Sequence, residues 1–388
     1  MKILLLAPQP FYTQRGTPIA IRNLASVLGD AGHQIDMLTY PGGIDVSLPN
    51  TQITRLWKIP FIDEVPVGFS FKKILYNFLM FFSVFWKVLI RRYDVIHAVE
   101  ESVYIALVFA PVKGSRVIYD MDSSMADQLL EKWLWLDRIK GILNWFEGLA
   151  IRYSTRVIAV CQALIDKANS YGSDTPIDLL TDTVLEIENE SGEQVEDLRS
   201  LIPQDHQLIL YIGNLEHYQG VDMVIEAMGQ VADKITFLVI GGIPDDIQRC
   251  RALAERLGVD QRIVFVGPRP VQLLQDYLQQ ADYLVSPRTK GVNTPMKIYS
   301  YLGAGVPVIA TNIASHTQVL NENNACLVEP DPSSIAAGIN KIASDRSYAR
   351  KLAVQAKQDA DELYSYEAYK HHLVDIYLSL EDDDEKFN

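Results

Sequence analysis

The sequence contains few cysteines, and their spacing excludes two classes of site. Cys161, Cys250 and Cys326 are the only cysteines in 388 residues, and they lie far apart along the chain. This arrangement offers neither the close pairs of a metal site nor the density of a disulfide framework, so no metal site is predicted. The scarcity of cysteine favours a reduced compartment and therefore a cytoplasmic location.

Positive charge is also scarce. Lysine and arginine number 35 against 49 aspartates and glutamates, which gives a formal net charge of −14. A general nucleic-acid-binding protein needs a basic surface to neutralise phosphates, so no nucleic-acid partner is expected. The fingerprint G-x-G-x-x-G is missing after the first strand-like run, which argues against a nicotinamide or flavin dehydrogenase.

Acidic residues are absent from the segment 69–93, FSFKKILYNFLMFFSVFWKVLIRRY, which is apolar on nearly every face and carries cations toward both ends. Its apolar core from Ile74 to Trp86 is about 13 residues long, whereas a membrane-spanning helix needs roughly 20, so a transmembrane helix is not predicted. Two interpretations remain open. The segment is either a helix buried between a sheet and its neighbours, or an interfacial helix on an anionic membrane surface. The second makes the protein peripheral at the inner face of the membrane.

Two series of strand-like runs alternate with helical repeats. The first begins with MKILLLAPQPFY, whose apolar run is too short for a signal peptide and is interpreted as a buried strand. The alternation predicts parallel sheets, and the length predicts two domains. The predicted strands cover residues 2–7, 34–39, 94–97, 116–119 and 156–160, then 208–212, 235–240, 263–266, 283–285 and 307–310.

An acidic segment with weak periodicity separates the two series. Residues 186–207 combine six acids between Glu186 and Asp197 with Ser191-Gly192 and Pro203, which is typical of a linker. The predicted divisions are an N-terminal domain at 1–185, a linker at 186–207, a C-terminal domain at 208–365, a helix at 366–380 and a solvated acidic tail at 381–388.

One stretch of the second half, SPRTKGVNTPMKIYSYLGAGVPVIAT (286–311), is rich in groups that suit an anion. A strand ends in a polar loop containing Arg288 and Lys290, and Pro295 is predicted to open a helix that carries Lys297. Cations and free backbone N–H groups at a helix N-terminus favour a phosphate. The alternative is an ordinary strand–loop–helix–strand crossover.

This stretch, with IGNLEHYQGVDMVIEAM before it and the N-terminal RGTPIAIRNLASVLGDAGHQIDMLTYP and YDVIHAVEESVYIAL, resembles glycosyltransferase family 4. The resemblance implies a GT-B architecture, in which two Rossmann-like, doubly wound α/β domains face each other across a cleft. It implies a nucleotide-sugar donor on the C-terminal domain, an acceptor on the N-terminal domain, and a final helix that crosses back to the N-terminal domain. It also implies transfer with retention of configuration, without a divalent metal or a cofactor beyond the nucleotide-sugar substrate.

The chain departs from the usual pattern of that family. Asn214 and Gln219 replace an Arg and a Lys that contact phosphate, and Val292 and Ser300 replace the glutamates of an E-x7-E pattern. Arg288 and Lys297 are therefore assigned to the diphosphate, because its charge must be neutralised when water is removed. The predicted donor-binding residues are Gly16, Gly213, Asn214, Gln219, Asn293, Thr294, Pro295 and Ser300.

Candidates for the acceptor side follow strands of the first half. Asp122 takes the place of a frequent family His and is predicted to orient the donor sugar or act as a base; the alternative is a helix N-cap for SSMADQLL. Glu100 and Glu101 are predicted to contact acceptor or sugar, and Arg15 to add a cation beside Gly16. His97 is interpreted as a structural histidine.

These features predict a retaining, metal-independent glycosyltransferase that moves a sugar from a nucleotide-sugar donor to a lipid-linked or polysaccharide acceptor. Two alternatives stay open. One is a non-catalytic GT-B protein that binds a sugar nucleotide, because the usual donor contacts are replaced. The other is a GT-B sugar-nucleotide epimerase.

Overall fold

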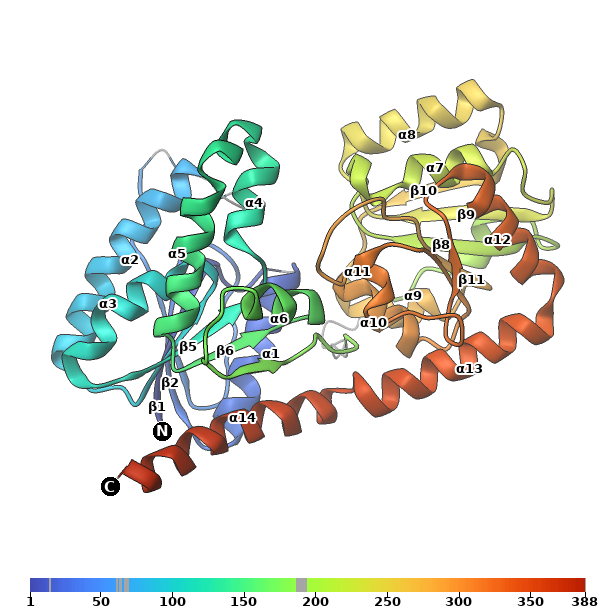
Figure 1. Ribbon diagram of the computed structural model, residues 1–388. Coiled ribbons are helices and arrows are strands. Elements are labelled where there is room, and N and C mark those ends of the chain that lie inside the picture. Colours follow the sequence, from blue (N-terminus) through green and yellow to red (C-terminus); the bar gives the residue numbers. More distant parts are fainter. Residues whose placement is uncertain (14, 61, 63–64, 66–69, 186–193, 388) are drawn as a thin grey trace. The chain divides into compact units, whose positions relative to one another are not determined.

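A computed structural model of the chain describes residues 1–13, 15–60, 62, 65, 70–185 and 194–387 (Figure 1). It divides into two compact units, one of residues 1–181 with 369–388 and the other of residues 182–368. The first eight residues of the predicted linker 186–207 lie outside the described residues. The boundary between the two units falls before residue 182, and only Gln207 of the predicted linker belongs to strand β8.

The first unit is built on a seven-stranded parallel sheet in the order β3-β2-β1-β4-β5-β6-β7. Strands β2 and β3 extend the sheet on one side of β1, and β4 to β7 extend it on the other. This is the doubly wound arrangement predicted from the sequence. Its strands are β1 Lys2–Pro10, β2 Gln34–Tyr40, β3 Thr51–Arg55, β4 Val95–Val99, β5 Arg116–Met121, β6 Arg156–Ala159 and β7 Ile177–Leu179. Its helices are α1 Gly16–Asp30, α2 Phe71–Ile90, α3 Val103–Lys113, α4 Met125–Lys132, α5 Lys140–Tyr153, α6 Gln162–Asn169 and α14 Tyr366–Phe387, with 3-10 turns η1 Glu100–Ser102 and η2 Leu134–Ile139.

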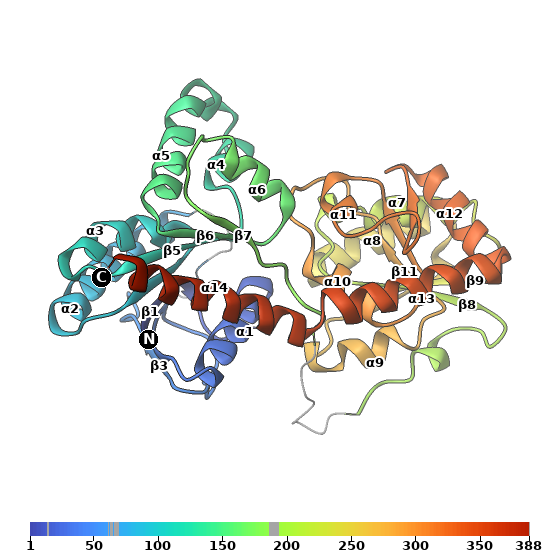
Figure 2. The same cartoon turned by 60° about the horizontal axis from the view of Figure 1, so that its bottom comes forward.

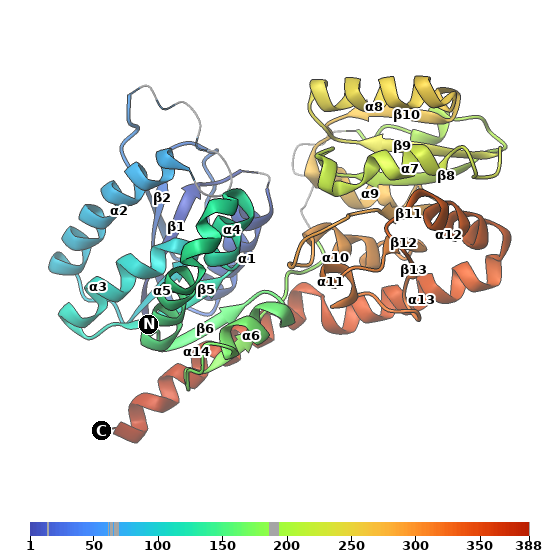
Figure 3. The ribbon, with the colours of Figure 1, turned by 45° about the horizontal axis from the view of Figure 1, so that its top comes forward.

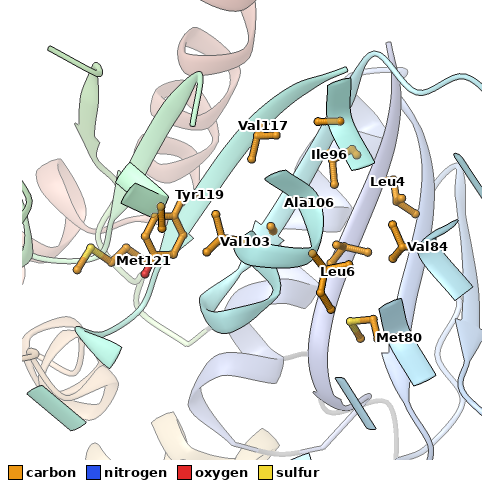
Figure 4. Close-up of a cluster of buried hydrophobic side chains, with 14 of the residues drawn as sticks. Leu4, Leu6, Met80, Val84, Ile96, Val103, Ala106, Val117, Tyr119 and Met121 are labelled. Carbon is orange, nitrogen blue, oxygen red and sulfur yellow. The ribbon is translucent and has the colours of Figure 1, made fainter. Parts of the chain in front are cut away.

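Alternate residues of these strands point to opposite faces of the sheet, so each face has its own core. On one face, Leu6 and Tyr119 pack in a buried cluster with Met80 of α2 and Val103 of α3 (Figure 4). A buried strand residue on the other face, His97, meets α14 instead. Both faces being covered explains why the strands read as continuous apolar runs.

Helix α14 returns the end of the chain to the first unit (Figure 2). The hydroxyl of Tyr377 lies 2.8 Å from Nδ1 of His97, and the guanidinium of Arg116 donates to the carbonyl oxygen of Leu380. Helix α14 continues to Phe387, so the segment predicted as a solvated acidic tail has a helical backbone over residues 381–387. Extending a helix that already exists requires no new nucleus, so the acidic residues follow it.

The second unit is built on a six-stranded parallel sheet in the order β10-β9-β8-β11-β12-β13. Its strands are β8 Gln207–Ile212, β9 Ile235–Ile240, β10 Ile263–Gly267, β11 Tyr283–Ser286, β12 Val308–Thr311 and β13 Cys326–Val328. Its helices are α7 Val221–Ala227, α8 Pro244–Leu257, α9 Leu274–Leu278, α10 Met296–Gly303, α11 Ala314–Thr317, α12 Pro332–Ser344 and α13 Arg346–Leu363, with 3-10 turns at Leu198–Leu201, His217–Gln219, Asp260–Arg262 and Val271–Leu273. The order again reverses beside β8, so loops from β8 and β11 meet at the carboxyl edge of the sheet, where ligands of such sheets bind.

Helix α2 lies along α3 on the outside of the first unit (Figure 3). Every third or fourth residue, from Tyr76 through Met80 and Val84 to Val88, is buried against the sheet. The opposite side is apolar but exposed, with Trp86 60% and Phe82 46% accessible. Of the two interpretations of 69–93, the helix buried between a sheet and its neighbours is therefore wrong for the described residues 70–93, because one side of the helix is exposed. Helix α2 has 20 residues and is therefore longer than the predicted apolar core. Among the described residues, one helix is long and apolar enough to cross a membrane, and it is α2, which nevertheless packs on the sheet.

Candidate functional site

Two glycines allow the loop after β8 to contact the backbone of two other loops, those after β9 and β11. Gly241 has φ +112°, and a Cβ built on it would lie 2.1 Å from the carbonyl oxygen of Gly213. Gly220 has φ +72°, and a Cβ there would lie 2.0 Å from the carbonyl oxygen of Pro287. Side chains are excluded at both positions, so the β8 loop lies directly against the loop that follows β11.

Lys297 lies in the first turn of α10, beside the β8 loop. Its Nζ donates to Oε1 of Gln219 at 3.0 Å and lies 4.2 Å from the ring centroid of Tyr211. Burial, and secondarily the Arg288 guanidinium, lowers the pKa of Lys297 from 10.5 to about 7. No carboxylate of the described chain forms an ion pair with it. A desolvated cation next to a second cation is an arrangement that suits an anionic ligand.

Arg288 is held in the loop by its own main chain. Its Nε donates to the carbonyl oxygen of Lys290 at 2.8 Å, and its Nη1 to that of Asn293 at 3.1 Å. The guanidinium also lies over the ring of Tyr218, 5.4 Å from the centroid. Arg288 and Lys297 are therefore brought together as predicted, since the two cations interact.

The start of α10 offers backbone and hydroxyl groups to the same place. The helix begins at Met296, and no side chain caps it. Pro295 is the residue before the helix, not its first residue as predicted, because its ψ of 133° is extended. The hydroxyl of Thr294 is buried and has no hydrogen-bond partner among the described residues. A buried hydroxyl beside an uncapped helix N-terminus fits a bound oxygen-rich group.

The remaining predicted donor residues of this unit are distributed unevenly. Gln219 is buried and accepts a hydrogen bond from Lys297. Its neutral side chain does not supply the positive charge of the Lys that it replaces in the family pattern. Gly213 follows β8, and its Cβ position would be 3.2 Å from Nζ of Lys297. Asn214 is exposed, and its carbonyl oxygen accepts a 2.6 Å hydrogen bond from Tyr211. The asparagine amide therefore faces solvent next to the cluster.

Ser300 lies one turn deeper in α10 and is fully buried. Its hydroxyl accepts the backbone N–H of Leu185 at 3.3 Å, so it anchors the chain that enters this unit. Val292 is exposed, and its carbonyl oxygen accepts from Gln318. The structure does not bring Ser300 to the exposed surface near Thr294, which is at odds with the predicted ribose contact.

A buried histidine, for which the sequence indicated no role, is linked by hydrogen bonds to the start of this loop. His316 of α11 bonds through Nε2 to the Ser286 hydroxyl at 3.0 Å and through Nδ1 to the carbonyl oxygen of Thr311 at 2.9 Å. The hydroxyl of Thr311 in turn donates to the carbonyl oxygen of Arg288. Burial lowers the pKa of His316 to about 4, so it stays neutral and adds no charge near Lys297.

In the first unit, Glu100 and Glu101 lie together at the carboxyl end of β4. Lys73 of α2 lies 3.2 Å from Oε1 of Glu101 and 3.8 Å from Oε2 of Glu100. Burial raises the pKa of Glu100, and the lysine opposes this rise. Glu100 also has φ +49°, a left-handed conformation that is costly for a side chain with a Cβ. Lys73 was not a predicted site residue, because its sequence context suggested only a membrane-facing charge.

Asp122 follows β5, and its alternative role as a helix cap is excluded. The residue that caps α4 is Ser124, whose hydroxyl accepts from the N–H of Asp127 at 3.2 Å. Ser123 links this segment to Glu100 by donating a hydrogen bond to its Oε1 at 3.3 Å. Asp122 is partly buried at the carboxyl end of the sheet.

The other predicted residues of the first unit are structural or exposed. His97 is fully buried between Tyr377 and Asp120, 3.2 Å from Oδ2 of the latter, so its structural interpretation is confirmed. Arg15 and Gly16 are exposed at the start of α1, which has no side-chain cap. A Cβ on Gly16 would meet nothing within 4 Å, so the described part of the chain leaves space there.

Two family models match the chain. The model described as "Glycosyltransferase Family 4" matches residues 15–180, and the model described as "Glycosyl transferases group 1" matches residues 206–345. An uncharacterized glycosyltransferase of Methanocaldococcus jannaschii is 29% identical over 191 residues, 48% of each protein, so the match spans about half the length of this relative. A phosphatidyl-myo-inositol mannosyltransferase of Mycobacterium leprae is 22% identical over 97% of this chain and 96% of that protein.

The fold recurs in the crystal structure of Anabaena HepE in complex with UDP-glucose. That structure superposes with a TM-score of 0.73 at 16% identity, over 98% of this chain and 100% of the other. The similarity covers both units and confirms the predicted pair of Rossmann-like domains of the GT-B fold. With both of its halves matched by models of these enzymes, the chain belongs to glycosyltransferase family 4.

Proposed function

We propose that the protein is an active glycosyltransferase whose nucleotide-sugar donor binds at Lys297 and Arg288. The observation that carries this proposal is the state of Lys297, a desolvated lysine with a pKa lowered to about 7 and no carboxylate partner in the described chain. A group in that state is stabilised when a dianionic diphosphate arrives. The unbonded hydroxyl of Thr294 and the uncapped start of α10 offer further contacts to the same phosphates.

The chemistry proposed is transfer with retention of configuration and without a metal ion. The two cations neutralise charge on the leaving diphosphate as the bond to the sugar breaks, which is the main demand of this step. The family resemblance supports retention. Val292 and Ser300, which replace the usual glutamates, supply no carboxylate in this loop, so the sugar must be oriented by other groups.

The acceptor is proposed to be a lipid-linked or polysaccharide molecule whose hydroxyl is bound by residues of the first unit. Asp122, Glu100 and Glu101 supply carboxylates at the carboxyl ends of two adjacent strands, where they accept hydrogen bonds from a hydroxyl. Lys73 favours the charged form of Glu100, because it opposes the rise that burial gives to the pKa of that carboxyl.

A peripheral position on the cytoplasmic face of a membrane is also part of the proposal. The exposed side of α2 is apolar and aromatic, and Lys72, Arg91 and Arg92 lie toward its ends. Such helices bind anionic lipid surfaces through buried apolar area and electrostatic attraction. Sedimentation with phosphatidylglycerol vesicles at low salt tests it: loss of binding in Trp86→Ser is expected, and failure of the wild-type protein to sediment contradicts it.

The donor site is tested by measuring the binding and turnover of UDP-, GDP- and ADP-sugars. We expect Lys297→Ala to lose most turnover while its melting temperature shows a folded protein, and Lys290→Ala, at an exposed lysine of the same loop, to stay near the wild-type rate. Normal turnover in Lys297→Ala would refute the assignment. Binding without hydrolysis or transfer would indicate the non-catalytic alternative, and formation of an isomeric sugar without acceptor would indicate an epimerase.

A further inference from the structure

A pocket of about 700 Å³ lies within the first unit, whereas Lys297 and Arg288 belong to the second. Its walls come from α2, α3, α4 and α5, which pack side by side on one face of the sheet. This volume is within the range of about 300–1,000 Å³ that ligand pockets occupy. The structural role of these helices, to cover the sheet, does not require a pocket between them.

The walls of this pocket are mostly hydrocarbon. They are formed chiefly by Ile74, Phe78, Phe81, Leu129, Leu143 and Phe146. The hydroxyl groups of a sugar and the polar edge of a nucleobase need hydrogen-bond partners, which such walls supply poorly. An alkyl or isoprenyl chain needs none and gains free energy for each methylene group it buries, about 0.8 kcal/mol.

Polar groups line the pocket beside the predicted acceptor carboxylates. Glu101 and Lys73 are both pocket residues, and Asn77 donates to Oε1 of Glu101 at 3.4 Å. Glu101 is the neighbour of Glu100, which Ser123 joins to the segment carrying Asp122. The pocket therefore connects hydrocarbon walls to the place where an acceptor hydroxyl is expected.

The pocket is also continuous with the exposed apolar side of the first unit. Phe78 and Phe146 line it and yet are 58% and 49% accessible. Exposed aromatics continue from them along α2 through Phe82 and Trp86, and at Trp145 on α5. Residues 70–92 contain no acid, but Lys73 pairs with Glu100 and Glu101, and Lys87 and Arg91 pair with Asp36. The charge that this segment offers to an anionic lipid surface is therefore carried chiefly by exposed Lys72 and Arg92.

We propose that this pocket binds the hydrocarbon chain of a lipid acceptor, with the polar head of that lipid at Glu100 and Glu101. The inference rests on the proposed glycosyltransferase function and narrows its acceptor to a lipid. The apolar side of α2 places the protein on the bilayer, and the pocket withdraws one chain from it. The carboxylates then position a hydroxyl of the head group, which stays anchored near the site throughout transfer.

The test uses the full-length protein and vesicles of phosphatidylglycerol that carries a photoactivatable diazirine on one acyl chain. After irradiation, labelled peptides are identified by mass spectrometry. We expect labels on residues of the pocket walls from at least α2 and α4, including Phe81 and Leu129, which are less exposed than the outer aromatics. Labels confined to outer residues such as Phe82 and Trp86 would overturn the proposal, as would the absence of any label.

A pair of adjacent substitutions on α5 provides the control. Leu143→Trp fills the pocket, whereas Ile142→Trp adds the same bulk at a neighbouring exposed position that does not line it. We expect Leu143→Trp to lose the pocket labels and Ile142→Trp to keep them, with both variants melting near the wild-type temperature. Equal labelling in the two folded variants would contradict the proposal.

Donor binding separates this failure from failure of the proposed function. Binding of a nucleotide sugar depends on Lys297 in the other unit, so Leu143→Trp is expected to leave its affinity unchanged. If a nucleotide sugar binds but the pocket takes no label, the lipid-chain inference alone fails. If no nucleotide sugar binds or turns over, the proposed function fails, and chain labelling then describes a lipid site of a different protein activity.

Discussion

The titration of Lys297 predicts how donor affinity depends on pH. Its pKa in the absence of a ligand is lowered from 10.5 to about 7, which corresponds to a cost of at most about 5 kcal/mol for carrying the charge there, reduced by partial exposure of the side chain. A bound diphosphate compensates the charge and raises this pKa again. Above pH 7, binding must therefore take up a proton, and the affinity should fall by about tenfold per pH unit.

The assay is calorimetric titration of UDP-glucose, or of the nucleotide sugar preferred in the screen, between pH 6 and 8.5. A nucleotide sugar is a better probe than a free nucleoside diphosphate, since a terminal phosphate itself titrates near pH 6. Lys297→Met should weaken binding at pH 6 by about 2–3 kcal/mol, on the order of 100-fold, and abolish the pH dependence. Lys290→Gln, in the same loop, should retain both affinity and pH dependence.

Without a bound nucleotide sugar, the stability of the protein should depend on the protonation of Lys297 in the opposite direction, rising with pH where donor affinity falls. Between about pH 7 and 10.5 the unfolded chain holds a proton on Lys297 that the folded protein does not, so its contribution to stability rises with pH in that window. Below pH 7 the folded state carries the buried charge at a cost. Lys297→Met should therefore raise the melting temperature at pH 6 while weakening donor binding. A flat pH profile in the wild-type protein, or a variant that loses both stability and binding, would refute the reasoning.

Five further substitutions test other parts of the structure. Ser124→Ala should lower the free energy of unfolding by at least about 1 kcal/mol, through loss of the α4 cap and of the hydrogen bond to buried Glu147, without slowing turnover, whereas Asp122→Ala should slow turnover with little change in denaturant midpoint. Tyr377→Phe leaves buried His97 without one partner, and denaturation should show a loss of about 1–3 kcal/mol. Ser300→Ala should cost about 0.5–1.5 kcal/mol of stability through the lost Leu185 bond and leave the donor Kd unchanged; a weaker Kd would restore the ribose role. Gly241→Ala places a methyl group against the Gly213 carbonyl, and thermal melting should show destabilisation of more than about 2 kcal/mol.

The fold was predictable because its physical signals are local. Buried parallel strands need unbroken apolar residues, and helices between them need apolar repeats at a period near 3.6, so the alternation along the chain specifies two doubly wound sheets. The short edge strands β3, β7 and β13 escaped prediction, since each spans only three to five residues at the margin of its sheet. The family resemblance also came from local motifs and was confirmed by the two model matches.

The donor loop was recognisable from its residue types, because cations, a proline and small polar residues are crowded into a few positions. Which of them share one surface was decided by tertiary structure. Lys297 donates to Gln219, while Ser300, on the same short helix, turns inward to Leu185. A helix rotates its residues by about 100° each, so neighbours in sequence face different environments.

The sequence of this protein by itself determined the two parallel sheets, the phosphate-suited loop and the apolar character of residues 70–92. Only the tertiary structure decided that α2 buries one narrow stripe and leaves its aromatic side exposed, and that Lys73 joins Glu100 and Glu101. It alone placed a pocket between four helices that are up to about 70 residues apart in sequence. The reason is physical: hydrophobic pattern selects secondary structure, whereas burial, charge pairing and cavities depend on which elements become neighbours in space.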